Sequence, residues 1–400
     1  YGGTDKETIS QIRFRAPNFY TTQNRAVTID DYKTLVLKDY NNIDAASVWS
    51  GEDNDPVIYG KVFLSLKTKN NYALSEADKN VIINDLITKR SVLTVTPEIV
   101  DPDYSYILVK GTVKYDPRLT TRSANDLLNY VKAAILDYSN QELNTFSSTL
   151  KKSRLQYYIE NSEQSITSSD ITVYLQKRVP LFTGTTTSYT ANFNTPIQKG
   201  DYNNRIFTTP EVQTFDPVGT SRNIYFEEAP TALTGIDSIS LISSGFNYST
   251  VPIVNIIGDG TGATAKAITN GSQVIAIEVL TSGSNYTKAT VQITGSQGYG
   301  AVAVPILQTT TGKLQSYYLS STGQKAILNS SAGTINYQTG KVIITNLFTQ
   351  QGTPQNRYYN TDVVAVNAPL ETEVVKSARN QIFTIDQNDP ISLQVNIIAE

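Results

Sequence analysis

The sequence predicts an α+β protein: a two-layer α/β sandwich followed by an all-β region that contains a small repeated β-module. Residues 28–181 alternate helical apolar periodicity with segments in which every second residue is apolar. After residue 181 the helical pattern stops, and Thr, Gly, Asn and Ser separate short alternating segments. Within this second region the segment 239–248 recurs, with changes, at 277–286, which indicates an internal repeat.

The first folded element is expected just after a polar N-terminal arm. Residues 1–27 are polar, and we expect them to be extended or partly helical. Helical periodicity then begins at Thr28, which with Asp31 fits a variant of the capping box. In that arrangement the Thr hydroxyl and the Asp carboxylate each bind a free amide of the first turn. The helix is expected to end near Asn41.

The helices and strands that follow come in a repeated order. A second helix is expected to begin at Ser75 and a third at Ser123, each with an Asp three residues later that completes the cap. The expected strands are 43–49, 57–67, 92–100, 104–115 and 171–179, with a fourth helix at 149–161. The order is helix–strand–strand twice, then helix–helix–strand. It predicts amphipathic helices over one face of a mainly antiparallel sheet.

Changes in composition divide the chain into six expected parts. They are an N-terminal arm (1–27), an α+β domain (28–181), the first part of a β-domain (182–235), an inserted β-repeat module of two units of about 38 residues (236–308), the second part of the β-domain (309–366) and a C-terminal segment (367–400). The module is interpreted as an insertion because both of its flanks look like parts of one β-domain. Since the chain opens at Tyr1, it is interpreted as a fragment or a processed chain.

The composition limits the chemistry that the chain can perform. It has no His, Cys or Met, so a Ser–His–Asp triad, a thiolate nucleophile, a disulfide and a His or Cys metal site are excluded. Carboxylates remain, so a glycosidase-like pair or a hard-cation site stays open. The net charge of -3 lacks the basic excess that binds nucleic acid. Apolar runs such as 363–366 are far shorter than the ~18 residues of a membrane span, so no membrane partner is expected.

Three acidic clusters are candidate cation sites, and each is weighed against an ordinary turn. They lie at 52–55, 101–103 and 386–389. Carboxylate oxygens suit hard cations, but the alternating ligand spacing and closing Glu of a calcium loop are missing. A solvated turn is therefore favoured for all three clusters.

Other local patterns favour structural roles in the same way. The Gly-rich segment 258–262 lacks the Lys-Ser/Thr ending of a phosphate loop, so a β-turn with positive backbone angles is favoured. The basic run 151–154 is more typical of a solvated helix face than of an anion site. Tyr157 and Tyr158 could stack on sugars or bases, but one of them is expected to pack onto the sheet, and Trp49 is expected in the core. No catalytic, cofactor-binding or metal-binding residue is assigned, no cofactor is expected, and the chain is not predicted to be an enzyme.

One segment of the sequence indicates a relationship to a known protein family, which composition alone does not. Residues 25–32, RAVTIDDY, resemble the RAVT-x-x-DY signature that opens the conserved domain of the baseplate J-like family; the signature positions are Arg25, Ala26, Val27, Thr28, Asp31 and Tyr32. The wider stretch 13–32 is similar to wedge proteins of large contractile-tailed bacteriophages. Segment 333–340, GTINYQTG, is similar to a turn motif of these proteins, and the repeated Ser-Gly-x-Asn-Tyr turn resembles decoration modules of phage virion proteins.

The resemblance implies a structural role in the virion. It implies a tail baseplate subunit, assembled in the host cytoplasm, whose wedges join into a ring around the hub and rearrange when the sheath contracts. The implied partners are the chain itself, through dimer and ring contacts, other baseplate wedge proteins, and hub or sheath-initiating proteins. Two other functions remain as alternatives. The Ser/Thr/Gly-rich β half is compatible with a tail-fibre or receptor-binding adhesin, and the available carboxylates are compatible with a carbohydrate-active enzyme.

Overall fold

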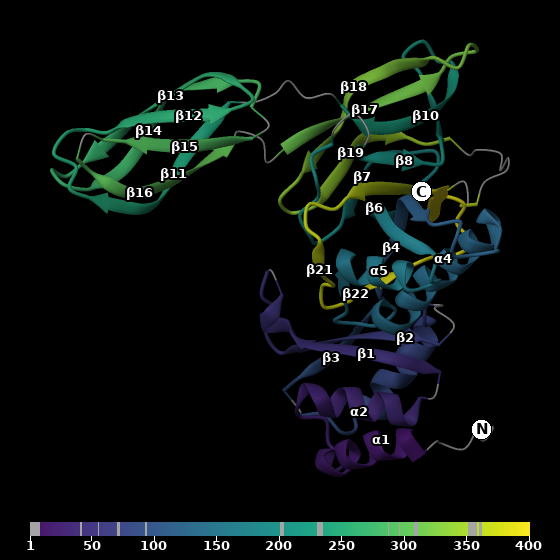
Figure 1. Cartoon of the computed structure of the whole chain (residues 1–400). Helices are drawn as coiled ribbons and strands as arrows, with labels where there is room; N and C mark the ends of the chain where they lie inside the picture. The colour runs from purple at the N-terminus through teal and green to yellow at the C-terminus, as the bar shows by residue number, and fades with distance from the viewer. Residues whose placement is uncertain are drawn as a thin grey trace.

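The structure, a computed structural model, is mostly β with few helices (Figure 1). It describes the chain apart from residues 1–8, 41, 55, 70–72, 93, 201–203, 230–234, 287, 296, 308–310, 351–357 and 360–361. No helix in the described part is long and apolar enough to cross a membrane.

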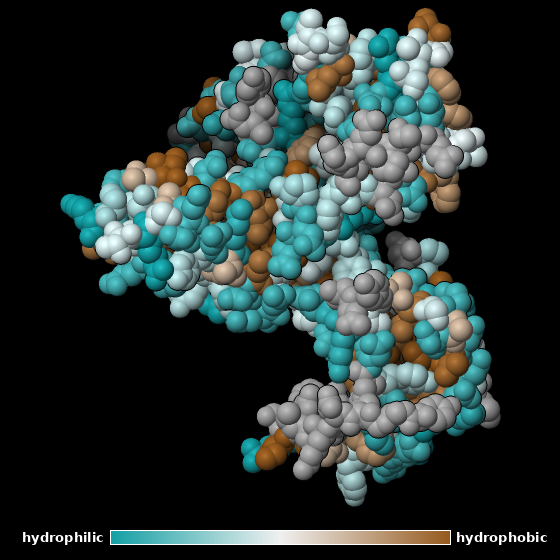
Figure 2. Space-filling view, turned by 90° about the vertical axis from the view of Figure 1, so that its right-hand side faces the viewer, coloured by the Kyte–Doolittle hydropathy of each residue, from teal (hydrophilic) through white to brown (hydrophobic). Residues whose placement is uncertain are grey.

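The N-terminal part is a three-stranded sheet with helices on one face. Strand β1 pairs antiparallel with β2, and β2 pairs parallel with β3. Helix α2 packs on β1 and against α1, burying an apolar cluster that includes Leu35, Val36 and Leu64. The elements are α1 (Ile9–Thr22), α2 (Ile29–Asp39), β1 (Ile43–Ser50), η1 (Gly51–Asp53), β2 (Lys61–Thr68), α3 (Glu76–Val81), η2 (Ile82–Ile87) and β3 (Thr96–Val100). Figure 2 shows this part below the larger β-rich part, with a hollow between the two along one side.

A twelve-stranded sheet forms the larger part of the molecule. Its strands follow the order β22-β4-β6-β20-β8-β10-β17-β18-β19-β7, with β23 also on β4 and β9 on β10. Helix α4 packs against α5 and β23, and α5 packs against β6, so these helices cover one end of the sheet. The elements are β4 (Asp103–Tyr115), α4 (Ala124–Tyr138), η3 (Ser139–Leu143), β5 (Thr149–Lys151), α5 (Lys152–Glu160), β6 (Ile166–Pro180), β7 (Thr186–Asn192), β8 (Phe207–Thr209), β9 (Val212–Phe215), β10 (Ser221–Glu228), β17 (Thr311–Leu319), β18 (Lys325–Asn336), β19 (Lys341–Phe348), β20 (Val363–Pro369), β21 (Val374–Lys376), β22 (Gln381–Thr384) and β23 (Leu393–Ala399).

The predicted helix starts are confirmed at three caps, and one predicted helix starts too early. Thr28, Ser75 and Ser123 each accept a hydrogen bond from the amide three residues later. The helix expected at 149–161 begins only at Lys152, because 149–151 forms β5 and pairs antiparallel with β21. A partner more than 200 residues away in the sequence leaves no local pattern, so helical periodicity alone could not place this boundary.

Residues 236–307 form a separate six-stranded module that stands away from the main sheet (Figure 1). Its first strand, β11, pairs with the last, β16, whereas β14 pairs with β13 and β12 pairs with β15. Each of these pairs therefore joins one of the first three strands to one of the last three. The strands are β11 (Ile236–Phe246), β12 (Ile253–Gly258), β13 (Thr261–Thr269), β14 (Val274–Ser284), β15 (Ala289–Thr294) and β16 (Tyr299–Leu307).

Corresponding residues of the two halves, which lie 38 positions apart in the sequence, make corresponding contacts. The buried Tyr248 hydroxyl accepts from the Ala301 amide at 3.3 Å, and the buried Tyr286 hydroxyl accepts from the Ala263 amide at 3.4 Å. Gly298 lies against the ring of Tyr248, as Gly260 does against Tyr286, where a Cβ would overlap the ring. Each half thus supplies a Tyr to the glycine strand of the other, and the module has a pseudo-two-fold arrangement.

The chain leaves the main sheet for the module and returns to the sheet at neighbouring positions. Strands β10 and β17 pair antiparallel, with Glu228 opposite Leu314, and the Ala229 amide donates to the Lys313 carbonyl at 2.8 Å. The buried apolar cluster of the main sheet contains no described residue of 236–307. Strands β10 and β17 therefore form a β-hairpin, and residues 236–307 lie in the segment that connects its two strands.

Replacing residues 230–312 with a two-residue Asn-Gly turn is expected to leave the rest of the chain folded, because this turn suits a β-hairpin that needs only two linking residues. The thermal unfolding midpoint of the shortened chain should stay within a few degrees of that of the full chain. Scanning calorimetry measures both. A shortened chain that unfolds without a cooperative transition would show that the main sheet depends on the module.

Candidate functional site

The signature residues form the hydrogen bonds that cap the N-terminus of α2. The amides of Val27 and Thr28 both donate to Asp31 Oδ2, at 3.2 and 2.8 Å, and the Asp31 amide donates to Thr28 Oγ1 at 3.3 Å. This reciprocal pattern confirms the predicted capping box. Ala26 is fully buried, and its amide donates to the Arg90 carbonyl at 2.8 Å, which ties the signature to the chain after η2.

The signature side chains divide into buried and exposed groups. Tyr32 is buried in the N-terminal core, and burial together with the nearby Asp31 charge raises the pKa of its phenol. Arg25 and Val27 are exposed, and Arg25 donates to Gln23 at 2.5 Å. The buried and capping members therefore build the fold, while Arg25 and Val27 are free to contact another molecule. A family-specific role for these positions stays a prediction.

Replacing Thr28 with alanine is expected to destabilise α2 by about 1 kcal/mol, because the Asp31 amide loses its acceptor. Amide hydrogen exchange over Ile29–Asp39 measures the effect. Asp30→Ala is the matched control in the same turn, since Asp30 makes only a 3.8 Å ion pair with Lys33 and should cost about 0.3–0.5 kcal/mol. Equal exchange in the two variants would contradict the capping role.

The structure places two of the acidic clusters in ion pairs. Asp53 pairs with Arg379 at 3.8 Å, and Asp55 lies outside the described residues. Asp101 pairs with Lys79 at 2.9 Å, and Asp103 pairs with Lys177. Among the described residues, no three acidic side chains come close enough to hold a metal ion together. These clusters therefore serve as surface and junction contacts in the described structure.

The remaining candidates have structural contacts. Gly258 ends β12 and Gly262 lies in β13 with a φ of 80°, so the segment is a bend between two antiparallel strands and contains one of the predicted positive backbone angles. Arg154 donates to Glu142 at 2.8 Å, and its guanidinium lies over the ring of Tyr158, which packs on the core. Trp49 is buried, stacks on Phe63 and donates to Asn54 at 2.9 Å. The core prediction for Trp49 is confirmed.

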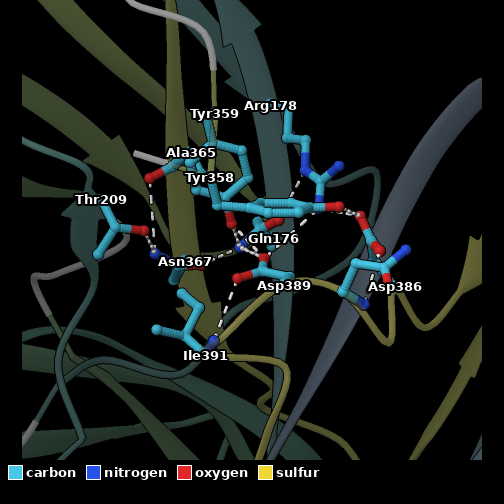
Figure 3. A network of polar contacts seen from close by, with 11 residues as sticks. Gln176, Arg178, Thr209, Tyr358, Tyr359, Ala365, Asn367, Asp386, Asp389 and Ile391 are labelled. Atoms are coloured by element: carbon cyan, nitrogen blue, oxygen red, sulfur yellow. Dashed lines mark hydrogen bonds and ion pairs between the residues drawn. The ribbon is translucent and has the colours of Figure 1, made fainter. Parts of the chain in front are cut away.

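A buried polar network joins β6 to the segment between β22 and β23 (Figure 3). The Arg178 guanidinium donates to Asp386 at 2.8 Å and to Asp389 at 3.4 Å, and it lies 3.6 Å from the centre of the Tyr106 ring. Asp389 is buried, and it also accepts from Gln176 at 3.2 Å and from the Tyr359 hydroxyl. The segment 386–389 is a turn, as predicted, but its two carboxylates are not solvated, because a distant Arg and a distant Tyr enclose them.

Electrostatics within this network favour a charged Asp386. Burial alone would raise its pKa, but hydrogen bonds from Tyr358 and Arg178 and the positive charge of Arg178 hold that pKa below its usual value. Burial and the hydrogen bond to Asp386 raise the pKa of Tyr358 to about 12. Asp386 is therefore ionised and Tyr358 neutral at pH 7, so the hydroxyl can donate to the carboxylate.

The contribution of Asp386 to stability should disappear in acid. Its folded pKa lies below the unfolded value of about 3.9, so the contribution is complete above that pH and is lost as pH falls through the folded pKa. The difference in unfolding free energy between the natural chain and Asp386→Asn should therefore be largest at pH 6–7 and shrink below about pH 4. Urea titrations across this range measure it; a constant difference down to pH 2.5 would contradict the assignment.

A second buried carboxylate explains the 333–340 motif. Glu228 accepts from both the Tyr337 hydroxyl, at 2.6 Å, and the Gly200 amide, at 3.0 Å to each oxygen. Gly333 lies where a Cβ would overlap the Ile343 carbonyl, and Gly340 adopts a φ of 69° in the turn before β19. The motif therefore forms the turn between β18 and β19, and it places the Tyr337 hydroxyl against Glu228 of β10, the strand that precedes the module.

Comparison with known proteins gives matches over the first half of the chain. The family model described as baseplate structural protein gp6, C-terminal domain I, matches residues 28–100, and that for C-terminal domain III matches residues 103–178. Baseplate wedge protein gp6 of Enterobacteria phage T4 is 27% identical over 205 residues, which cover 51% of this chain and 29% of that protein. The chain thus spans less than a third of the length of this relative.

A solved structure also matches. It is the cryo-EM structure of the anti-feeding prophage (AFP) baseplate, 6-fold symmetrised, with 18% identity and a TM-score of 0.32 over 43% of this chain and 39% of that chain. The family matches agree with the observed elements. The first runs from Thr28, the cap of α2, to the end of β3, and the second runs from the start of β4 to Arg178 at the centre of the polar network.

Proposed function

We propose that this chain, a baseplate wedge protein by its two gp6 C-terminal domains, is a structural subunit of the baseplate in a contractile phage tail. The observation that carries the proposal is the consecutive match of both domains, separated by two residues, over elements that the structure also separates. Asp53, Asp101 and Asp386, one from each acidic cluster, are engaged in ion pairs, which supports a structural rather than a catalytic role.

In this proposal the chain forms wedges that join into a ring around the hub and rearrange when the sheath contracts. Its partners are further copies of itself, in a dimer and in the ring, other wedge proteins, and hub or sheath-initiating proteins. The two separate apolar cores support such a rearrangement, because the junction between them includes the partly exposed Arg379–Asp53 ion pair rather than a shared core. Polar interdomain junctions of this kind permit relative motion.

The proposed organisation keeps the boundaries expected from the sequence. It has an arm (1–27), an α/β region (28–181) whose first part (28–100) and second part (103–181) belong to different sheets and cores, a β-domain in two parts (182–235 and 309–366), an inserted repeat module (236–308) and a C-terminal segment (367–400) whose strands β22 and β23 join the twelve-stranded sheet. The packing of α2 on β1 and of α5 on β6 supports the layered α/β description. Insertion of the module within the β10–β17 hairpin supports its treatment as an addition to the β-domain.

Immunogold electron microscopy of tail particles, with an antibody against residues 236–308, tests the proposal. Gold at the tail tip, on the body of the baseplate, is the expected result. Gold along the fibres would favour an adhesin instead. Absence of the chain from purified particles, established by mass spectrometry, would overturn the structural role.

A further inference from the structure

Strands β18 and β19 of the main sheet pair at one end and diverge at the other. The last pair joins Gly333 to Ile344, and no further pair follows among their described residues. Beyond this point β18 continues with β17 to the end of their hairpin, whereas β19 pairs on with β7. The chain after β19 then meets β9, where the Gln350 amide donates to the Gln213 carbonyl at 2.9 Å. The diverging strands therefore leave a space between them.

Irregular backbone on both sides shapes this space. The register of β18 on β17 shifts on each side of Ser316, and the register of β19 on β7 shifts between Ile344 and Leu347. Within the second shift Asn346 adopts a φ of 50°, which is uncommon for a residue other than glycine. Bulges of this kind redirect side chains and are frequent beside binding sites.

A pocket of about 340 Å³ lies between the diverging strands. Its apolar lining comes from β10, β18 and β19 and includes Phe226, Leu328 and Leu347. Phe215 and Phe348 also line it, and their rings stack with centroids 5.8 Å apart. The volume equals that of about eleven water molecules and lies at the small end of the range for ligand pockets. It suits a single large side chain.

Ser316 brings a buried hydroxyl to this pocket. The residue is only 2% exposed, and its hydroxyl has no hydrogen-bond partner among the described residues. The charged groups of the lining, by contrast, are already engaged, since Asp216 accepts from Arg222 at 3.1 Å. A buried hydroxyl without a partner is destabilising, so such groups are normally satisfied by water or by a ligand. The Ser316 hydroxyl is therefore available to whatever occupies the pocket.

Thr214 carries a second hydroxyl of this kind and is 6% exposed. It pairs with Arg222, whereas Ser316 pairs with Phe226, four residues further along β10. The two hydroxyls therefore lie about 13 Å apart along the strand, too far to bond the same ligand atom. Thr214 lies beside the Asp216–Arg222 ion pair, and Ser316 lies beside the apolar lining. A ring inserted against that lining meets Ser316.

These features select one kind of side chain. A charged side chain would find no free counter-ion, because Asp216 and Arg222 neutralise each other. A sugar would bury several hydroxyls against an apolar lining. A wholly apolar side chain would displace water from the Ser316 hydroxyl without replacing its hydrogen bond. A phenol combines an apolar ring with one hydroxyl that both donates and accepts, so it satisfies the ring-sized space and the hydroxyl together.

We propose that this pocket is an anchor site for a tyrosine side chain of a neighbouring baseplate subunit. The ring lies against Phe226, Leu328 and Leu347, and its hydroxyl bonds to Ser316. The inference rests on the proposed function, which supplies the neighbouring subunit. Protein interfaces concentrate their affinity in a few aromatic anchors, Tyr among them, that fill desolvated pockets.

Titration of the full chain with p-cresol, followed by NMR of the Leu328 and Leu347 methyl groups, tests the pocket. A Kd of about 1 mM is expected for a ligand of this size. Ser316→Ala should weaken p-cresol binding about three- to ten-fold and leave toluene binding unchanged, because only p-cresol loses a hydrogen bond. Thr214→Val removes the other unpartnered hydroxyl of the pocket and is the matched control. It should bind p-cresol like the natural chain.

If Ser316→Ala fails to fold, a comparison of ligands on the natural chain gives a second readout. The natural chain should bind p-cresol at least as tightly as toluene, whereas a merely apolar cavity prefers toluene. Three results would overturn the proposal: no shift of either leucine up to about 10 mM p-cresol, equal weakening by Ser316→Ala and Thr214→Val, or tighter binding of methyl glucoside than of p-cresol.

Photo-cross-linking in tail particles tests the occupant. Asn329→p-benzoylphenylalanine places the reactive group at an exposed position of the pocket lining. The expected product joins the chain to a peptide of a baseplate subunit with a tyrosine within a few residues of the cross-link. Particles that contain the chain but give no cross-link, or a peptide without tyrosine, would overturn the anchor role. Absence of the chain from particles would instead overturn the proposed function, and p-cresol binding would be unaffected.

Discussion

Replacing Arg178 with methionine is expected to lower the unfolding free energy by about 3–5 kcal/mol, because it leaves Asp386 and the buried Asp389 without their cation. The Asp389 side chain is only 1% exposed, so water cannot replace the lost partner. The largest loss of protection should appear in hydrogen exchange of β6 and of residues 386–391, which the network joins. Chemical denaturation of the whole chain measures the total effect.

Arg379→Met is the matched control for this change. Arg379 pairs with Asp53 at 3.8 Å, and both side chains are half exposed, so its loss should cost less than about 1 kcal/mol. Adding Asp389→Asn to Arg178→Met should recover part of the stability, because the orphaned charge is removed. Equal losses from Arg178→Met and Arg379→Met would contradict the account of a buried, charge-paired network.

Replacing Glu228 with alanine is the second change expected to have a large effect, about 3–5 kcal/mol. It removes the common acceptor of the Gly200 amide, the Ile206 amide and the Tyr337 hydroxyl; Ile206 and Tyr337 are buried and Gly200 is partly buried. Each buried donor left without an acceptor costs about 1–3 kcal/mol. Native-state hydrogen exchange of the Gly200 and Ile206 amides and of β18 measures the loss directly.

The neighbouring residue provides the comparison for Glu228. Glu227 accepts fewer hydrogen bonds: its carboxylate accepts from Lys325 at 2.6 Å and from Gln315 at 2.9 Å, and Lys325 is half exposed. Glu227→Ala should therefore cost about 1–2 kcal/mol. Glu228→Gln keeps one acceptor oxygen and should fall between the two alanine variants. A larger loss at Glu227 than at Glu228 would mean that the buried acceptor is not the important feature.

Local patterns in the sequence predicted the local parts of the structure. The caps at Thr28 and Ser123 need only residues three positions apart, and both were found where the pattern placed them. The strand β5 was missed because its partner, β21, lies far along the chain. Pairing with distant strands decides the extended conformation there, and a local pattern cannot contain it.

The same limit applies to the candidate site. The signature segment was visible because its residues are consecutive, whereas Arg178 and Asp389 come from segments 211 residues apart. One signal was available: Gln176 interrupts the apolar pattern of β6 and is fully buried, so it needed a polar partner from elsewhere. Which residues supply that partner depends on the order of strands in the sheet, and sequence alone did not give that order.

The parallel pairing of β23 with β4 has a consequence for the order of events during synthesis. Residues 109–115 of β4 meet residues 393–399, the last strand described. At about 5–20 residues per second, a ribosome needs roughly 15–60 s to make the chain between them. The β11–β16 module, whose strands span residues 236–307, is complete roughly 4–17 s before β23 is made. Through this interval one edge of β4 has no strand to bind, and an unpaired edge is where chains aggregate. In the last part of this interval the projecting module can fold while that edge of β4 is still unpaired.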